Sequence, residues 1–149
     1  QRSWDFDVVS QGFRFHMSNI NAAIGIEQLK RIELFKEKRQ LIVQRYIKIL
    51  SLINEVKFLN LNYKEIIPHI FVIKVKNRDG LRDYLLKSGI ECGIPYKPNH
   101  MLQMYSNPLI TLPVTESLYK EIISLPCHVD LSLLEQDYVI QKIGEFYNA

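Results

Sequence analysis

The fold is decided by residues 12–29, which read GFRFHMSNINAAIGIEQL. Aromatic and basic side chains alternate in the first part of this stretch, so Phe13 and Phe15 should share one side of an extended chain. Arg14 and His16 should share the other side. The apolar residues that follow predict a helix. We therefore expect an extended segment that leads directly into a helix N-terminus.

The start of this helix has two possible roles. Ser18 or Asn19 is predicted as its N-cap, because short polar side chains accept hydrogen bonds from the first free N–H groups. Those N–H groups carry a partial positive charge, and Arg14 and His16 stand just ahead of them. The pattern fits a site for a phosphate or carboxylate. It also fits a solvated edge where Ser18 only caps the helix.

Composition predicts a globular protein. The 149 residues are 47% hydrophobic, enough for one domain with a core, and the net charge of +3 is too small to indicate nucleic-acid binding. No apolar run has the length of a membrane span, and no signal-peptide pattern opens the chain, so a cytoplasmic protein without membrane contact is expected. Cys92 and Cys127 have no metal spacing, which suits a reducing compartment.

Hydrophobic periodicity predicts a long helix in two parts over residues 19–53. The first part, residues 20–29, is apolar on most sides and is predicted to be buried all round. The second part narrows to one apolar stripe, made of Ile32, Phe35, Ile42, Val43, Tyr46, Ile49, Leu50 and Ile53. Its other faces are rich in Lys and Arg, but Glu33 and Glu37 are interspersed. A solvated outer face is therefore favoured over a nucleic-acid-binding helix.

The rest of the chain alternates between short apolar runs and helical patterns. Strands are predicted over residues 56–61, 70–75 and 90–94, and helices over 77–89, 113–125 and 132–146. Gly89 should end the first of these helices. Ser132 and Glu135 have the spacing of a capping box at the start of the last one. These elements predict one α/β (α+β) domain, a long N-terminal helix plus a small sheet covered by helices.

The loop over residues 95–108, PYKPNHMLQMYSNP, is the second candidate site. It carries Tyr96, Lys97 and His100, and a loop with several large or ionisable side chains is a candidate wall of a site. A packed surface loop is the alternative. No serine stands in a nucleophile elbow, the glycines form no phosphate loop, and the four histidines are dispersed, so neither a catalytic residue nor a metal site is predicted.

Three segments resemble the DegT/DnrJ/EryC1/StrS family of sugar aminotransferases, which depend on pyridoxal 5′-phosphate (PLP) and have fold type I. Residues 4–39, WDFDVVSQGFRFHMSNINAAIGIEQLKRIELFKEKR, resemble the part that follows the catalytic lysine region. Residues 68–100 resemble the family's strand, short helix and G-I-x-Y loop, and residues 112–146 its C-terminal helices with the S-L-P-x-H turn. The resemblance spans essentially the whole chain and implies that residues 1–149 form the small C-terminal domain.

The resemblance also implies which residues bind. The family motif usually reads G-Y-N-Y-R-M, with its Asn on the cofactor phosphate of the other subunit and its Arg on substrate phosphates. Arg14 stands at the Asn position and is expected to bind the PLP phosphate in trans. His16 stands at the Arg position and is expected to bind substrate. In the loop, Tyr96 keeps the family's Tyr and His100 matches its later His; with Lys97 they are expected near the nucleotide diphosphate.

By resemblance, the intact enzyme is a homodimer with active sites at its interface. It would transfer an amino group from an amino acid, expected to be glutamate, to a nucleotide-linked keto-sugar for surface-polysaccharide or antibiotic-sugar synthesis. The large domain with the Schiff-base lysine is expected to be absent from this chain, which should be inactive by itself. The alternative is a non-catalytic dimerisation or regulatory module derived from the same family.

Overall fold

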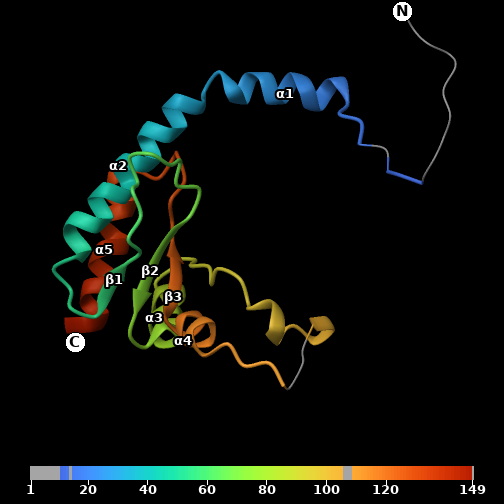
Figure 1. The fold of residues 1–149 in the computed structure, drawn as a ribbon. Helices are drawn as coiled ribbons and strands as arrows, with labels where there is room; N and C mark the ends of the chain where they lie inside the picture. The colour runs from blue at the N-terminus through green and yellow to red at the C-terminus, as the bar shows by residue number, and fades with distance from the viewer. Residues whose placement is uncertain (1–10, 14, 106–108, 149) are drawn as a thin grey trace, which may run out of the picture. The chain divides into compact units, whose positions relative to one another are not determined.

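The computed structural model describes residues 11–13, 15–105 and 109–148. It divides into two compact units, residues 1–32 and residues 33–149. Each unit has its own internal structure, and the larger one contains the sheet (Figure 1).

The first unit is built on helix α1, Asn19–Leu29. Its N-cap is Ser18, one of the two predicted candidates, because Ser18 Oγ accepts a hydrogen bond from the Asn21 N–H at 3.2 Å. The prediction that this helix is buried all round is wrong for the described residues. Ile20 is 73% exposed and Leu29 is 68% exposed. In the described part of this unit, α1 has no second helix or strand against which these side chains could pack.

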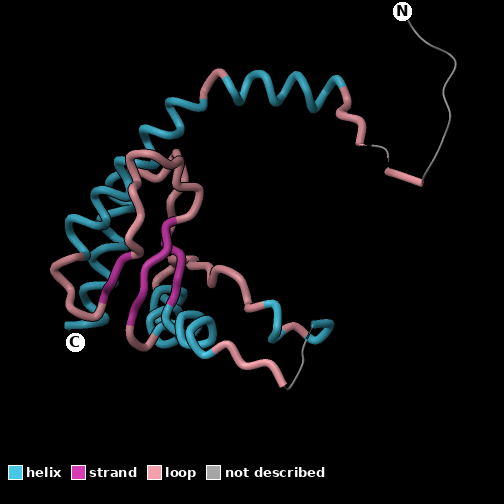
Figure 2. Tube along the Cα trace, in the orientation of Figure 1, coloured by secondary structure: helices cyan, strands magenta, loops and turns pink. Residues whose placement is uncertain are grey.

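The second unit combines helices with a three-stranded antiparallel sheet in the order β1-β2-β3 (Figure 2). In chain order, its elements in the described residues are α2 (Ile32–Leu50, beginning at the unit boundary), β1 (Val56–Phe58), β2 (Phe71–Val75), α3 (Arg78–Lys87), the 3₁₀ helices η1 (Asn99–Met101) and η2 (Gln103–Tyr105), α4 (Pro113–Glu121), β3 (Ile122–Leu125) and α5 (Leu133–Asn148). The predicted α/β (α+β) class is confirmed, with α2 and α5 running side by side next to the sheet (Figure 1).

The central strand β2 organises the core. Its residues alternate, so Phe71, Ile73 and Val75 are buried while the side chains between them are half-buried. The Phe71 ring stacks on Tyr46 of α2, with centroids 5.5 Å apart and planes 8° apart. Phe71 also contacts the ring of Phe58 in β1 at 6.2 Å, so one side chain joins α2 to two strands.

The predicted apolar stripe of α2 is confirmed in its C-terminal half, where Ile42, Val43, Tyr46 and Leu50 are buried. Tyr46 donates a hydrogen bond to the Pro126 carbonyl at 3.2 Å. Burial of this phenol raises the pKa of Tyr46 well above its usual range.

Helix α5 lies against α2 through a buried polar contact. The fully buried Gln136 donates from Nε2 to the Ile42 carbonyl at 2.7 Å. At the start of α5 the predicted capping box is confirmed: the Ser132 N–H donates to Glu135 Oε2 at 2.8 Å, and the Glu135 N–H donates to Ser132 Oγ at 3.2 Å. The hydrogen bond from the Ser132 hydroxyl, followed by that from its N–H, lowers the pKa of Glu135.

Two predicted elements are wrong. Residues 90–94 form no strand and contribute only the isolated bridge from Gly93 to Ser124. The helix predicted over residues 113–125 ends at Glu121, and Ile122–Leu125 form β3 beside β2. The run Ile122-Ile123 explains the change, because β-branched side chains favour a strand and one edge of β2 was open for pairing. The helix end predicted at Gly89 is confirmed, with a left-handed φ of 77°.

Replacement of Phe71 by Ala tests whether this ring holds the core together. Deleting a buried aromatic ring typically costs about 3–5 kcal/mol, so Phe71→Ala should lower the free energy of unfolding by that amount in urea denaturation. Leu61→Ala is the matched control, because Leu61 is 52% exposed and its truncation should change stability by less than about 0.5 kcal/mol. Equal losses for the two variants would contradict this account of the core.

Candidate functional site

The first predicted site lies in the smaller unit. Arg14 is outside the described residues. His16 is exposed in the segment that leads into α1. The rings of Phe13 and Phe15 contact each other with centroids 6.1 Å apart, as expected for two side chains on the same side of an extended chain.

The second predicted site is the loop after Gly93 in the larger unit. Its start is fixed to the sheet, because the Ser124 N–H of β3 donates to the Gly93 carbonyl at 2.8 Å. The described part of the loop contains the short helices η1 and η2, which the sequence did not predict. It then leads to α4, whose first residue is Pro113.

A cleft of about 280 Å³ separates this loop from α4 and contains two of the predicted residues. The loop side is formed by Tyr96, Lys97, Pro98 and Asn99. The opposite side is formed by Thr115, Leu118 and Tyr119 of α4 and by Ile122 at the start of β3. Tyr96 is 81% exposed, which leaves its ring and hydroxyl accessible. Its φ of 55° places the backbone in the left-handed region, where a side chain with a Cβ is strained.

His100 makes its contact with α4 instead of lining this cleft. Its Nε2 lies 3.0 Å from Glu116 Oε1, and its side chain is only 11% exposed. The same carboxylate oxygen accepts a hydrogen bond from the Leu112 N–H at 2.9 Å. The backbone hydrogen bond from Leu112, followed by the contact with His100, lowers the pKa of Glu116. Glu116 is therefore ionised at neutral pH and ties the loop to the helix.

The helix side of the cleft is supported from behind by a buried arginine. The guanidinium of Arg78 lies over the Tyr119 ring, 5.4 Å from its centroid, and donates from Nη1 to the Ile122 carbonyl at 3.2 Å. Arg78 is only 5% exposed, so it holds both groups in place. Glu116 and Tyr119 are not among the residues predicted from the sequence, because their approach to the loop depends on the fold. The sequence holds one signal for Glu116. Pro113 is typical of the first position of a helix, so Glu116, three residues later, is expected as a carboxylate in the first turn.

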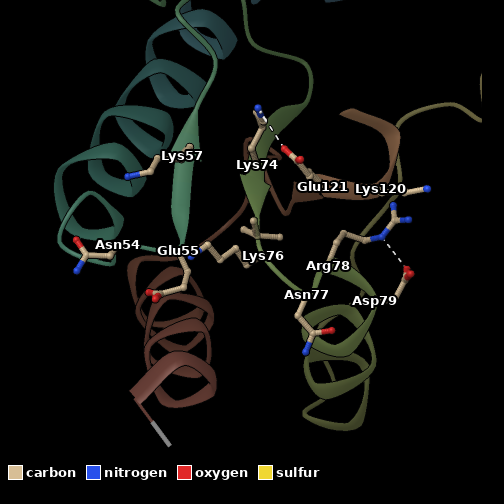
Figure 3. A pocket seen from close by; sticks show the side chains of 11 residues that line it. Asn54, Glu55, Lys57, Lys74, Lys76, Asn77, Arg78, Asp79, Lys120 and Glu121 are labelled. Carbon is tan, nitrogen blue, oxygen red and sulfur yellow. Dashed lines mark ion pairs between the residues drawn. The ribbon is translucent and has the colours of Figure 1, made fainter. Parts of the chain in front are cut away.

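A second cleft, of about 440 Å³, lies at the end of the sheet beside the start of α3 (Figure 3). It contains several cations, but two of them are paired within the cleft. Lys74 Nζ lies 3.2 Å from Glu121 Oε2, and Arg78 Nε lies 2.6 Å from Asp79 Oδ1 (Figure 3). Because each of these two cations already has a carboxylate partner, the arrangement gives weak support for an anion site.

Other kinds of site find little support in the described residues. Among them, no group of three or more His, Cys, Asp and Glu side chains is placed to hold a metal ion. Burial raises the pKa of the Cys92 and Cys127 thiols to about 11, so both are protonated at neutral pH and are poor nucleophiles. No helix in the described part of the chain has the length and apolar character needed to cross a membrane.

Comparison with known proteins gives one consistent result. The model of the DegT/DnrJ/EryC1/StrS aminotransferase family matches residues 2–144. A curated relative, the UDP-4-amino-4,6-dideoxy-N-acetyl-beta-L-altrosamine transaminase of Campylobacter jejuni, is 29% identical over 147 residues, which cover 93% of this chain and 39% of the relative.

Solved structures agree in sequence and in fold. A DegT DnrJ EryC1 StrS aminotransferase from Brucella abortus is 34% identical, with a TM-score of 0.86 over 97% of this chain and 40% of that one. The PLP-form of a protein assigned as a sugar aminotransferase from Streptococcus pneumoniae is 27% identical, with a TM-score of 0.87 over 98% of this chain and 40% of that one. The chain thus spans about two fifths of the length of these relatives.

The strained backbone at Tyr96 gives a stability test of the site. Tyr96→Gly should be more stable than Tyr96→Ala by about 0.5–1 kcal/mol in urea denaturation. The left-handed conformation costs a residue with a Cβ about 1–2 kcal/mol, and the larger unfolded-state entropy of Gly offsets part of this difference. Tyr96→Phe keeps the ring and the Cβ and should match the original chain. Equal stability of the Gly and Ala variants would contradict the strain.

Proposed function

The chain belongs to the DegT/DnrJ/EryC1/StrS aminotransferase family, and from this premise we propose that it is the C-terminal domain of a nucleotide-sugar aminotransferase. The intact enzyme would transfer an amino group from an amino acid, glutamate by resemblance, to the ketone of a nucleotide-linked sugar. The observation that carries the proposal is the family match over residues 2–144, supported by a relative named as a transaminase of a UDP-linked sugar. Its expected setting is the cytoplasm, in the synthesis of surface polysaccharides or antibiotic sugars.

The proposed cofactor is PLP, and the donors in this chain suit its phosphate. Arg14, which lies outside the described residues, has a guanidinium that can bind phosphate through two hydrogen bonds. The N-terminus of α1, capped by Ser18, follows it closely and favours an anion. When bound, the cofactor supplies the electron sink for the reaction, while the protein supplies position and electrostatics. The Schiff-base lysine is proposed to lie outside this chain.

The residues of this chain would bind and orient the substrate. Tyr96 offers an accessible hydroxyl and ring, and Lys97 a positive charge beside it, at the cleft that faces α4. His100 stands at the same loop, and His16 is proposed to bind substrate near the phosphate-binding segment. Hydroxyl, ammonium and imidazole groups are all suited to the diphosphate of a sugar nucleotide.

The proposed homodimer is supported by the exposed apolar surface of α1. Ile20, Ile24 and Leu29 are each more than half exposed, which is unusual for a helix with so few charges. Burial of such a helix against a partner would remove this surface from water. The active sites would then lie at the dimer interface, with Arg14 reaching the cofactor of the other subunit.

Removal of the Arg14 side chain tests the cofactor assignment. In the intact protein, Arg14→Ala should lower PLP retention roughly 10- to 100-fold, since a hydrogen bond to a charged group contributes about 1.5–3 kcal/mol. Retention is measured by absorbance of the bound cofactor after dialysis. Arg82→Ala removes an exposed arginine of α3 and is the matched control. Unchanged retention in Arg14→Ala would refute the assignment.

The isolated 149-residue chain gives a second test. Mixed with PLP and then with borohydride, it should yield no specific lysine adduct by mass spectrometry, because none of its lysines stands in the family's lysine motif. The intact protein, treated in the same way, should be labelled at one lysine outside this chain. Stoichiometric labelling of a single lysine within residues 1–149 would contradict the proposal.

A further inference from the structure

We propose that Glu116 is a positioning residue that fixes the ring of His100 for substrate binding. This inference rests on the proposed function, because it deepens the role of the loop at residues 95–101. The two side chains come from segments 16 residues apart, and their contact joins the loop to the first turn of α4.

The geometry determines which nitrogen of His100 carries a proton. Glu116 Oε1 lies 3.0 Å from His100 Nε2 and accepts a second hydrogen bond from the Leu112 N–H at 2.9 Å. An ionised carboxylate can only accept, so Nε2 must donate. Nδ1 is then the ring nitrogen that remains for another group, and the tautomer of the neutral ring is set by Glu116.

The contact also fixes the ring in space. The His100 side chain is 11% exposed, so it is held between the loop and α4 with little room to rotate. Glu116 directly follows Thr115, and one turn later Tyr119 completes the helix side of the cleft. The carboxylate therefore sets the separation between the loop that carries Tyr96 and the helix that faces it.

Glu116 also has a purely structural role that any test must separate. Its bond to the Leu112 N–H satisfies a backbone donor at the start of α4. Loss of this bond would lower stability whether or not His100 binds substrate. A double-mutant cycle on ligand affinity separates the two roles, because a residue that acts through His100 loses its effect on binding once His100 is removed.

The experiment uses the intact protein and UDP, with dTDP in parallel, as calorimetric probes of the nucleotide site. Glu116→Ala and His100→Ala should each weaken binding about tenfold. The double variant should bind as His100→Ala does, although it is less stable. Glu116→Gln should restore most of the affinity, since its amide oxygen accepts the same two hydrogen bonds. Glu121→Gln, on the same helix, is the matched control and should bind like the original protein.

The outcomes separate this inference from the proposed function. If His100→Ala weakens binding and Glu116→Ala does not, the positioning role is refuted and the nucleotide site stands. Additive losses in the double variant would also refute it, because Glu116 would then act independently of His100. If neither diphosphate binds the original protein, or if binding is indifferent to both residues, the proposed function of this loop and the inference fall together.

Discussion

The contact of Phe71 with Tyr46 is the interaction on which the larger unit depends. Phe71 lies on the central strand β2, and its ring meets α2 on one side and the ring of Phe58 in β1 on another. Tyr46 extends the connection, because its hydroxyl reaches the Pro126 carbonyl just after β3. A three-stranded sheet has little surface of its own to bury, so its stability comes from the helices that cover one face. These two rings therefore join α2 to β1, to β2 and to the residue that follows β3.

This core positions the candidate site through β3. The strand pairs with β2 from Phe71 to Lys74, and its Ser124 holds the start of the loop at Gly93. The same strand follows α4 without an intervening loop, so both sides of the cleft are fixed to one strand. Two side chains then fix the distance between the loop and α4. Arg78 packs on the ring of Tyr119, and Glu116 contacts His100. A loop anchored in this way can present Tyr96 and Lys97 at low entropic cost.

Local sequence patterns predicted most of the helices and strands, because the interactions that start and end these elements involve residues close together in the sequence. The Ser18 cap, the Ser132–Glu135 capping box and the Gly89 helix end all depend on neighbours in sequence. The two errors share another cause. Residues 90–94 are as apolar as a strand, but only Gly93 pairs with the sheet. Residues 122–125 fit a helical pattern in the sequence, but in the structure they pair with the edge of β2 as strand β3. Which of two apolar segments pairs with the edge of a strand depends on tertiary packing, and a local sequence pattern contains no information about that packing.

The sequence by itself determined the α/β class, the boundaries of α2 and α5 to within a few residues, and the family resemblance. It also predicts Tyr96, Lys97 and His100 as candidate site residues. Only the tertiary structure decided what these residues face. Thr115, Glu116 and Tyr119 reach the loop because α4 leads directly into a strand that pairs with β2. The physical reason is that helix and strand signals act over a few residues, whereas a site needs side chains brought together across the fold.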